Sequence, residues 1–205
     1  MAVPDWFAQL LQRELAAWVA LSPEQVSRLY EHYTLLERWN TKMNLTSVGP
    51  GRETVIRHYC ESLFFAAQLE NHARSVADIG SGAGFPGVPI AILKPDWRVS
   101  LVESNQRKAV FLREATRSLP NVSVIAQRAE NVSGLYDWLV SRAVSPKEVS
   151  ALIPGLAPKI GLMLGESDFL EIQHAKPIAW SEPIQLPWGD RRICVFGQVS
   201  CGTLG

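Results

Sequence analysis

Cysteine is scarce in this sequence of 205 residues. The three cysteines, Cys60, Cys194 and Cys201, are an odd number, lie far apart and form no CxxC pair. A disulfide framework and a zinc site both need closely patterned cysteines. We therefore expect free thiols and no bound metal.

Long hydrophobic runs are absent as well. No apolar segment approaches the roughly 20 residues that a membrane-spanning helix needs. The first residues, Met1 to Trp6, have neither the basic start nor the apolar core of a signal peptide. These features predict a cytoplasmic protein without a membrane partner.

The sequence also lacks an excess of charge of either sign. Its formal net charge of zero argues against a generally basic nucleic-acid binder. The stretch from Ser104 to Lys147 is locally basic, and either a surface for a polyanion or a solvated helix face would give that pattern. Its basic residues are Arg107, Lys108, Arg113, Arg117, Arg128, Arg142 and Lys147, against the acidic Glu114, Glu130 and Asp137.

The remaining composition is that of an ordinary globular protein, with 47% hydrophobic and 20% charged residues. The length fits one sizeable domain with a small extension, and we expect a monomer. The apolar residues from Trp6 to Trp18 recur at helical intervals. Ser22–Gln25 has the features of a capping box with proline at the first helical position, and a further helix should run from about Glu53 to Leu69. We predict a helical extension over residues 1–72, packed on a core domain over residues 73–205.

From Ser75 onward, short apolar runs alternate with helical segments, as they do in a parallel α/β sheet. The expected strands lie at 76–79, 99–103, 122–125, 136–140 and 160–164, with helices at 87–93 and 106–119. Two more strand candidates, at 178–180 and 192–196, have no clear helix between them, and the turn Pro187–Asp190 indicates a hairpin. We therefore predict an α/β fold with a mostly parallel, Rossmann-like sheet and an antiparallel C-terminal edge.

A glycine-rich loop, Asp78 to Gly87, follows the first expected strand. Its four glycines are Gly80, Gly82, Gly84 and Gly87. Glycine adopts backbone angles that other residues avoid and lets a ligand approach the main chain closely. Open α/β sheets bind ligands at the carboxyl ends of their strands, so we expect a ligand here.

The identity of that ligand depends on the neighbouring residues. Residues 82–87 formally match the dinucleotide fingerprint GxGxxG, and Glu103 ends the next strand, where an acid would hold ribose hydroxyls. Asp78 would repel a pyrophosphate but could hold the ammonium group of a methionine moiety. Pro86 and Pro89 remove backbone donors that a pyrophosphate needs. These residues favour S-adenosylmethionine over a nicotinamide dinucleotide.

Several of these motifs together resemble the bacterial small-subunit ribosomal RNA guanine-N7 methyltransferases, also called the glucose-inhibited division protein B family. The resemblance covers roughly residues 35 to 165. The matching segments are Asn44–Ser47, Arg57-His58, Asp78–Gly87, Arg107–Leu112 and Ser141–Ala143.

The resemblance implies a class I methyltransferase fold, S-adenosylmethionine as cofactor and 16S rRNA of the small ribosomal subunit as partner, with 7-methylguanosine as product. It implies that Gly80 and Phe85 line the cofactor site, that Glu103 holds the ribose, and that Ala129 and Glu130 contact the adenine region. Arg142 would lie at the cofactor and substrate pocket. The expected cofactor-binding residues are Asp78, Gly80, Gly82, Gly84, Phe85, Glu103, Ala129, Glu130 and Arg142. The expected RNA-binding residues are Arg57, His58, Arg107 and Lys108.

The expected chemistry needs little from the protein. Guanine N7 has a lone pair and carries no proton, so methyl transfer needs alignment rather than a general base. Arg142 is the candidate catalytic residue, because an arginine could donate to O6 or offset charge developing on the base. A cofactor contact or a structural ion pair are the alternatives for it.

One position departs from the family's pattern. The family usually has lysine before the glycine that ends the fifth strand, and this chain has Leu164 there, followed by Gly165 and Glu166. If that lysine touches the RNA or the target base, this chain must use another cation. Three other functions stay open: a methyltransferase for a small molecule or protein, a nicotinamide-dependent oxidoreductase, and a noncatalytic RNA-binding assembly factor.

Overall fold

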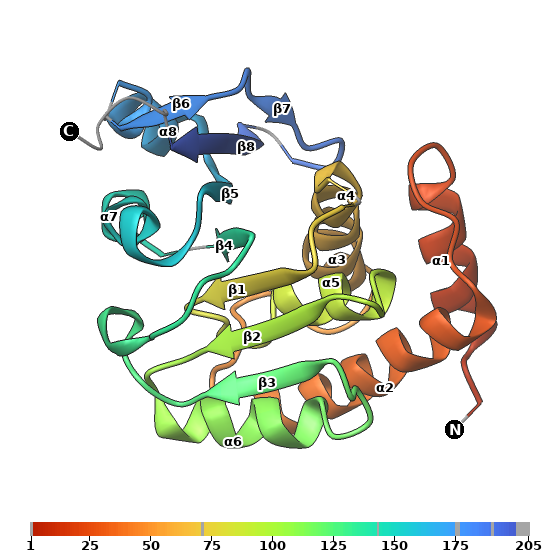
Figure 1. Cartoon of the computed structure of the whole chain (residues 1–205). Coiled ribbons are helices and arrows are strands. Elements are labelled where there is room, and N and C mark those ends of the chain that lie inside the picture. The colour runs from red at the N-terminus through yellow and green to blue at the C-terminus, as the bar shows by residue number, and fades with distance from the viewer. Residues whose placement is uncertain (1, 71, 143, 175–176, 190, 200–205) are drawn as a thin grey trace.

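A single mixed sheet with helices on both faces forms the body of the molecule (Figure 1). The computed structural model describes residues 2–70, 72–142, 144–174, 177–189 and 191–199. The eight-stranded sheet has the order β3-β2-β1-β4-β5-β8-β6, and β7 pairs with β8 beside this path. The predicted α/β class with a mostly parallel sheet is confirmed.

Two helices begin the chain. Helix α1 spans Asp5–Leu15 and helix α2 spans Pro23–Asn40. The predicted capping box is present, since Ser22 Oγ accepts the Gln25 N–H at 3.2 Å and Gln25 Oε1 accepts the Ser22 N–H at 2.9 Å. These reciprocal bonds satisfy donors that a helix start otherwise leaves without partners.

The next helical segment differs from the regular helix that the sequence predicts. It consists of α3 (Arg52–Thr54), a π-helix η1 (Val55–Cys60) and α4 (Glu61–Gln68). A π-helix carries an extra residue per turn, which changes the direction of the following side chains. Arg57 and His58 both lie in η1. The periodicity of apolar residues in the sequence does not reveal this π-helix, because apolar residues recur at helical intervals both before and after it.

Five parallel strands form the part of the sheet that carries the glycine-rich loop. They are β1 (Ser75–Ile79), β2 (Arg98–Val102), β3 (Val122–Ile125), β4 (Trp138–Arg142) and β5 (Lys159–Gly165). The elements α5 (Gly87–Leu93), α6 (Gln106–Ala115), η2 (Ala129–Asn131) and α7 (Pro146–Leu156) connect them. The fourth strand begins two residues later than predicted, so that Arg142 is its last residue.

The C-terminal strands form the antiparallel edge. Helix α8 (Glu166–Ile172) leads to β6 (Ile178–Trp180), β7 (Ile184–Gln185) and β8 (Arg192–Val199). Strand β8 runs antiparallel to β5, β6 and β7. The predicted turn therefore joins β7, rather than β6, to β8, and its residue Asp190 lies outside the described residues.

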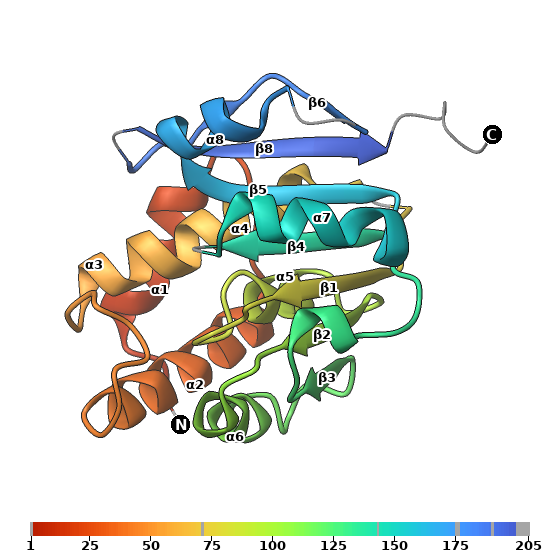
Figure 2. The same ribbon diagram turned by 90° about the vertical axis from the view of Figure 1, so that its left-hand side faces the viewer.

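Apolar clusters cover both faces of the sheet. One cluster joins α1, α2, α4, α5 and α6 to the sheet, including Phe7, Leu36, Phe65 and Phe111. The other joins α7 and α8 to the sheet, including Val149, Ile153 and Phe169, and Figure 2 shows α7 across β4 and β5. The N-terminal helices thus share a core with the sheet, and the domain boundary at residue 72 stays a prediction. Among the described residues, no helix is long and apolar enough to cross a membrane.

Candidate functional site

The loop after β1 turns sharply at three glycines. Gly80, Gly82 and Gly84 have φ values of 71°, 56° and 91°, in the left-handed region that favours glycine. Gly80 and Ser81 donate their N–H groups to Val102 O at 2.9 and 3.1 Å. The loop is therefore fixed to the carboxyl end of the neighbouring strand β2.

The glycines of this loop have different surroundings. A Cβ atom built on Gly80 would lie 2.3 Å from Val144 Cγ2, so the protein itself fills that space. A Cβ on Gly82 would meet only Gly80 O, at 3.7 Å. The expected open approach to the main chain is therefore present at Gly82, whereas at Gly80 the space belongs to Val144.

Asp78 lies beneath the loop. Its side chain is fully buried, and Oδ2 accepts the Gly87 N–H at 3.0 Å. Burial raises the pKa of the Asp78 carboxyl from 3.8 to about 7, and the hydrogen bond from Gly87 opposes this shift. Asp78 thus supports the loop from inside, and the predicted contact with a ligand's ammonium group stays a prediction.

Glu103 follows β2 and holds the loop from the other side. Its Oε2 accepts the Gly82 N–H at 2.9 Å, and its Oε1 accepts the Asn105 N–H at 2.7 Å. These charge-assisted bonds connect the glycine loop to the start of α6. The predicted ribose-binding acid and the most open glycine of the loop are therefore in direct contact.

Phe85 belongs to an aromatic cluster between the loop and the N-terminal helices. Its ring stacks on His58, with centroids 4.9 Å apart and an angle of 17°, and meets Tyr59 and His32 edge-on. Only 6% of Phe85 is exposed. The predicted role in lining a cofactor site is untested, but the packing shows that Phe85 anchors the loop to α2 and η1.

His58 is held by the segment Asn44–Ser47. Asn40 Oδ1 accepts the N–H groups of Leu45 and Thr46 at 2.8 and 3.0 Å, and Thr46 Oγ1 lies 2.7 Å from His58 Nε2. Burial and then the charges of Arg142 and Arg57 lower the pKa of His58 from 6.5 to about 3. His58 is therefore neutral at physiological pH, and its predicted RNA contact stays a prediction.

Arg142 ends β4 and belongs to a buried ion cluster. Its Nη2 lies 3.2 Å from Glu61 Oε2, and Arg192 Nη2 lies 2.7 Å from Glu61 Oε1. Glu61 is 1% exposed. Burial raises the pKa of Glu61, and the charges of the two arginines oppose that shift. Arg142 thus takes part in an ion pair, one of the alternatives that the sequence left open.

A cavity of about 260 Å³ opens beside this cluster, at the carboxyl ends of β4 and β5. The start of the α3–η1–α4 segment lies beyond the arrowheads of β1 and β4 (Figure 2). The lining residues are Arg57, Glu61, Arg142, Val144, Met163, Leu164, Gly165, Asp168, Leu186 and Arg192. Val144 borders both the cavity and Gly80, so the cavity adjoins the glycine loop.

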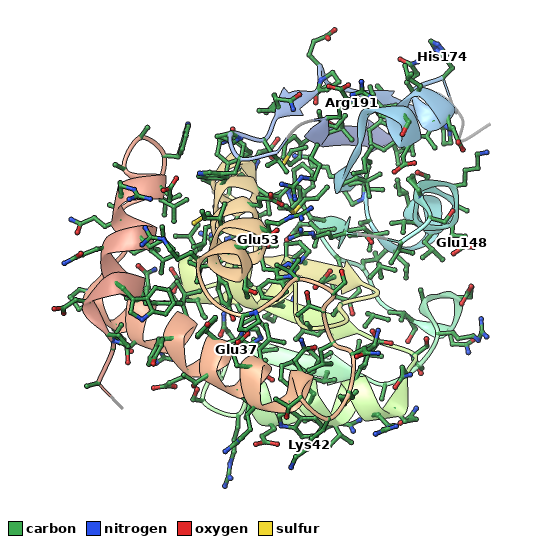
Figure 3. All side chains as sticks on the ribbon, turned by 180° about the vertical axis from the view of Figure 1, so that it is seen from behind. Glu37, Lys42, Glu53, Glu148, His174 and Arg191 are labelled. Atoms are coloured by element: carbon green, nitrogen blue, oxygen red, sulfur yellow. The ribbon has the colours of Figure 1, made fainter. Side chains whose placement is uncertain are left out.

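The other predicted residues lie apart from this cavity. Arg107 is exposed on α6 and borders a groove of about 570 Å³, together with Trp39 near the end of α2 and Lys42 just after that helix; Figure 3 labels Lys42. Lys108, half-buried, follows Arg107, and both N–H groups are capped by Asn105. Ala129 and Glu130 lie in η2 after β3, with Glu130 exposed.

Two residues of the ion cluster were missed from the sequence. Glu61 begins α4, four residues after Arg57 and shortly before the apolar run at residues 63–67, and an acid next to such a run is the signal that could have found it. Arg192 faces Gly165 across the antiparallel pair β5–β8, and only the strand register brings it to the cavity.

The comparisons with known proteins agree with this architecture. The family model described as "rRNA small subunit methyltransferase G" matches residues 25–176. Ribosomal RNA small subunit methyltransferase G of Nitrosomonas europaea is 43% identical over 126 residues, which are 60% of this chain and 58% of that protein. The protein of the same name from Xanthomonas campestris pv. campestris is 38% identical over 86% of this chain and 88% of its own length.

A solved structure with the same fold is a SAM dependent methyltransferase from Aquifex aeolicus. It is 13% identical, covers 72% of this chain and 93% of its own, and has a TM-score of 0.57. That likeness concerns the fold alone. The family model, which matches most of the chain, and the identity to the Xanthomonas protein confirm the resemblance: the chain belongs to the rRNA small subunit methyltransferase G (GidB) family.

Proposed function

We propose that this protein is an S-adenosylmethionine-dependent methyltransferase that methylates N7 of a guanine in 16S rRNA. The observation that carries the proposal is the contact between Glu103 and the left-handed Gly82 in a chain of this family. An acid at the end of the second strand and an open glycine loop are what a bound adenosine needs. The substrate part of the proposal is supported by the names of the relatives.

The residues present fit the cofactor. The side of Gly82 where a side chain would project is open, so a ligand can approach the main chain there. Glu103 would hold the ribose hydroxyls, and Gly80, Gly82, Gly84 and Phe85 would line the cofactor site. Asp78, Ala129, Glu130 and Arg142 remain proposed cofactor-binding residues. When bound, S-adenosylmethionine supplies an electrophilic methyl group on a sulfonium.

The protein's own contribution is alignment. Guanine N7 attacks through its lone pair, so the chain needs to orient the base and exclude water rather than remove a proton. The cavity beside Arg142 adjoins the glycine loop through Val144 and is of a size for one base. Arg142 would orient the base by donating to O6, and the Glu61 carboxylate beside it would offset the positive charge that develops on the methylated ring.

Methyl transfer to RNA tests the proposal directly. The purified chain is incubated with labelled cofactor and either 30S subunits or naked 16S rRNA from a strain lacking the activity, and N7-specific cleavage then maps the product. We expect one labelled guanine, and its loss in the variant Glu103→Ala. Cofactor binding without RNA labelling would overturn the assignment of RNA as the substrate. Labelling of a small molecule or a protein instead would favour a methyltransferase for that class of substrate.

Other properties belong to the proposal as well. We propose that the protein acts as a monomer in the cytoplasm, and that Arg57, His58, Arg107 and Lys108 contact the RNA. Among the described residues, no group of histidine, cysteine or acidic side chains could hold a metal ion. Methyl transfer that persists in a chelator would support the prediction that no metal is needed.

A further inference from the structure

The cavity at the carboxyl ends of β4 and β5 contains buried polar atoms without hydrogen-bond partners. Among the described residues, these include Arg57 Nε, both carboxylate oxygens of Glu61, Arg142 Nη1 and Arg192 Nη1. The ion pairs bring charges together at 3.2 and 2.7 Å, but they leave these atoms without a hydrogen bond. Buried polar groups are nearly always hydrogen-bonded, so such a concentration in one cavity needs an explanation.

The atoms without hydrogen bonds are of two kinds, which the ion pairs hold side by side. Guanidinium nitrogens are donors only, whereas the oxygens of an ionised carboxylate are acceptors only. A phosphate would satisfy the arginines but would be repelled by Glu61 and by Asp168, which also lines the cavity. The matching ligand therefore presents an acceptor beside donors, on a flat body that fits between the apolar walls of Val144, Met163 and Leu164.

We propose that this cavity reads the Watson–Crick edge of the target guanine, with Arg192 and Glu61 as specificity-determining residues. Guanine presents O6, an acceptor, beside the N1–H and N2–H donors. Arg192 or Arg142 donates to O6, and Glu61 accepts from N1–H and N2–H. Bases taken out of a stack are commonly read on this edge. The inference rests on the proposed function and names the residues that choose its substrate.

This orientation leaves the reacting atom free. N7 lies on the edge of the purine away from N1 and N2, so a base held by its Watson–Crick edge keeps N7 exposed. Val144 separates the cavity from Gly80, and the glycine loop lies on that side. Reading O6, N1 and N2 thus selects guanine without occupying the nitrogen that accepts the methyl group.

The same cluster supplies a cation where the family usually has a lysine. Leu164 lines the cavity as an apolar wall, and Arg192 lies opposite the next residue, Gly165, on β8. A cation from the neighbouring strand thus takes the place of one at position 164. Arginine suits this position because its planar fork can pair with Glu61 and still donate to a carbonyl oxygen.

Adenine would be rejected by the same arrangement. Its Watson–Crick edge presents an amino donor where guanine has O6 and an acceptor where guanine has N1–H. The donor would face a guanidinium and the acceptor would face Glu61, leaving buried groups without partners. A good pairing of this type is worth roughly a 10-fold to 100-fold preference for the correct base.

Binding of short RNAs tests the proposal. Fluorescence anisotropy, with S-adenosylhomocysteine at saturation, gives the affinity of the protein for short RNAs. Each RNA is a single-stranded uridine tract with guanine, inosine or adenine at one position. The wild type should bind the guanine RNA at least about 10-fold more tightly than the adenine RNA. Arg192→Met should lose this preference, and Glu61→Gln should lose the preference for guanine over inosine, which lacks the N2 amino group.

Matched variants separate recognition from general damage. Arg191→Met changes an exposed neighbouring arginine at the turn before β8 (Figure 3) and should behave as the wild type. Leu164→Phe narrows the cavity without changing a charge, and it should weaken binding of the guanine RNA. This variant keeps the test possible if the buried-charge variants fail to fold. The affinity for S-adenosylhomocysteine, measured by calorimetry, should stay within about twofold of the wild type in Arg192→Met and in Leu164→Phe.

Two results would overturn the proposal. A wild type that binds guanine and adenine RNAs equally shows that the cavity does not read the base. A loss of S-adenosylhomocysteine affinity in Arg192→Met and Leu164→Phe, with RNA preference intact, shows that the cavity holds the amino-acid end of the cofactor instead. A guanine preference without methyl transfer to 16S rRNA would refute the proposed function and leave the recognition site standing.

Discussion

Gly80 provides the sharpest test of how the glycine loop is built. Alanine at this position would keep a φ of 71°, which costs a residue with a side chain about 1–2 kcal/mol. Its Cβ would also lie 2.3 Å from Val144 Cγ2, and overpacking of this kind typically costs about 1–3 kcal/mol. We therefore expect Gly80→Ala to lower the free energy of unfolding by about 2–5 kcal/mol, a large part of the usual 5–15 kcal/mol.

The steric part of that cost can be isolated with Val144→Ala, which removes the Cγ2 atom. In urea unfolding, Gly80→Ala should cost about 1–3 kcal/mol less in the Val144→Ala background than in the wild type. The midpoint and slope of the urea transition, followed by far-ultraviolet circular dichroism, give both free energies. An equal cost in both backgrounds would refute the clash with Val144. It would indicate instead that Gly80 contributes through its backbone conformation alone.

Three further changes test the loop and the RNA surface. Glu103→Gln replaces the carboxylate proposed to hold the ribose hydroxyls by an amide, whose oxygen can still accept the Gly82 N–H. Calorimetry should show about 10-fold weaker S-adenosylhomocysteine binding, as expected for a hydrogen bond that loses its charged acceptor; unchanged affinity would contradict this role. Burial raises the pKa of Asp78 from 3.8 to about 7, so its contribution to stability is present below pH 3.8 and lost as pH rises to 7. Compared with Asp78→Asn, the wild type should lose unfolding free energy over that interval in urea titrations, and a constant difference would exclude this titration. Arg107→Gln should lower the slope of log binding constant against log salt concentration for RNA by about one unit. The control Arg98→Gln, at the amino end of β2, should leave that slope unchanged. Equal slopes for wild type and Arg107→Gln would show that Arg107 does not contact the RNA.

The sequence predicts the fold well where one physical signal dominates. Strand 122–125 and strand 178–180 have the predicted bounds, because short apolar runs between turn residues have few alternatives. The capping box at Ser22 is local and is also found as predicted. The π-helix η1 and the pairing of β7 with β8 were not predicted, because both depend on tertiary packing rather than on local periodicity.

The candidate site divides in the same way. The loop glycines and Glu103 are visible in the sequence because each follows a strand, and parallel strands bring their carboxyl ends together. Arg142 was placed by resemblance, but its partners were not. Leu164 appeared to leave the chain one cation short, since a linear sequence shows only what stands at position 164.

Strand register supplies what the sequence could not. Gly165 pairs with Arg192 across β5 and β8, and Glu61 reaches the same place from the start of α4. A carboxylate that is 1% exposed is costly unless cations accompany it. Replacing such a cluster with apolar residues would often be neutral or stabilising, so its stability alone does not account for it. The donors and acceptors left without hydrogen bonds instead face a cavity next to the glycine loop. A buried charge cluster that its own fold leaves unsatisfied, at the substrate side of a methyltransferase-family sheet, is best explained by the base that completes it.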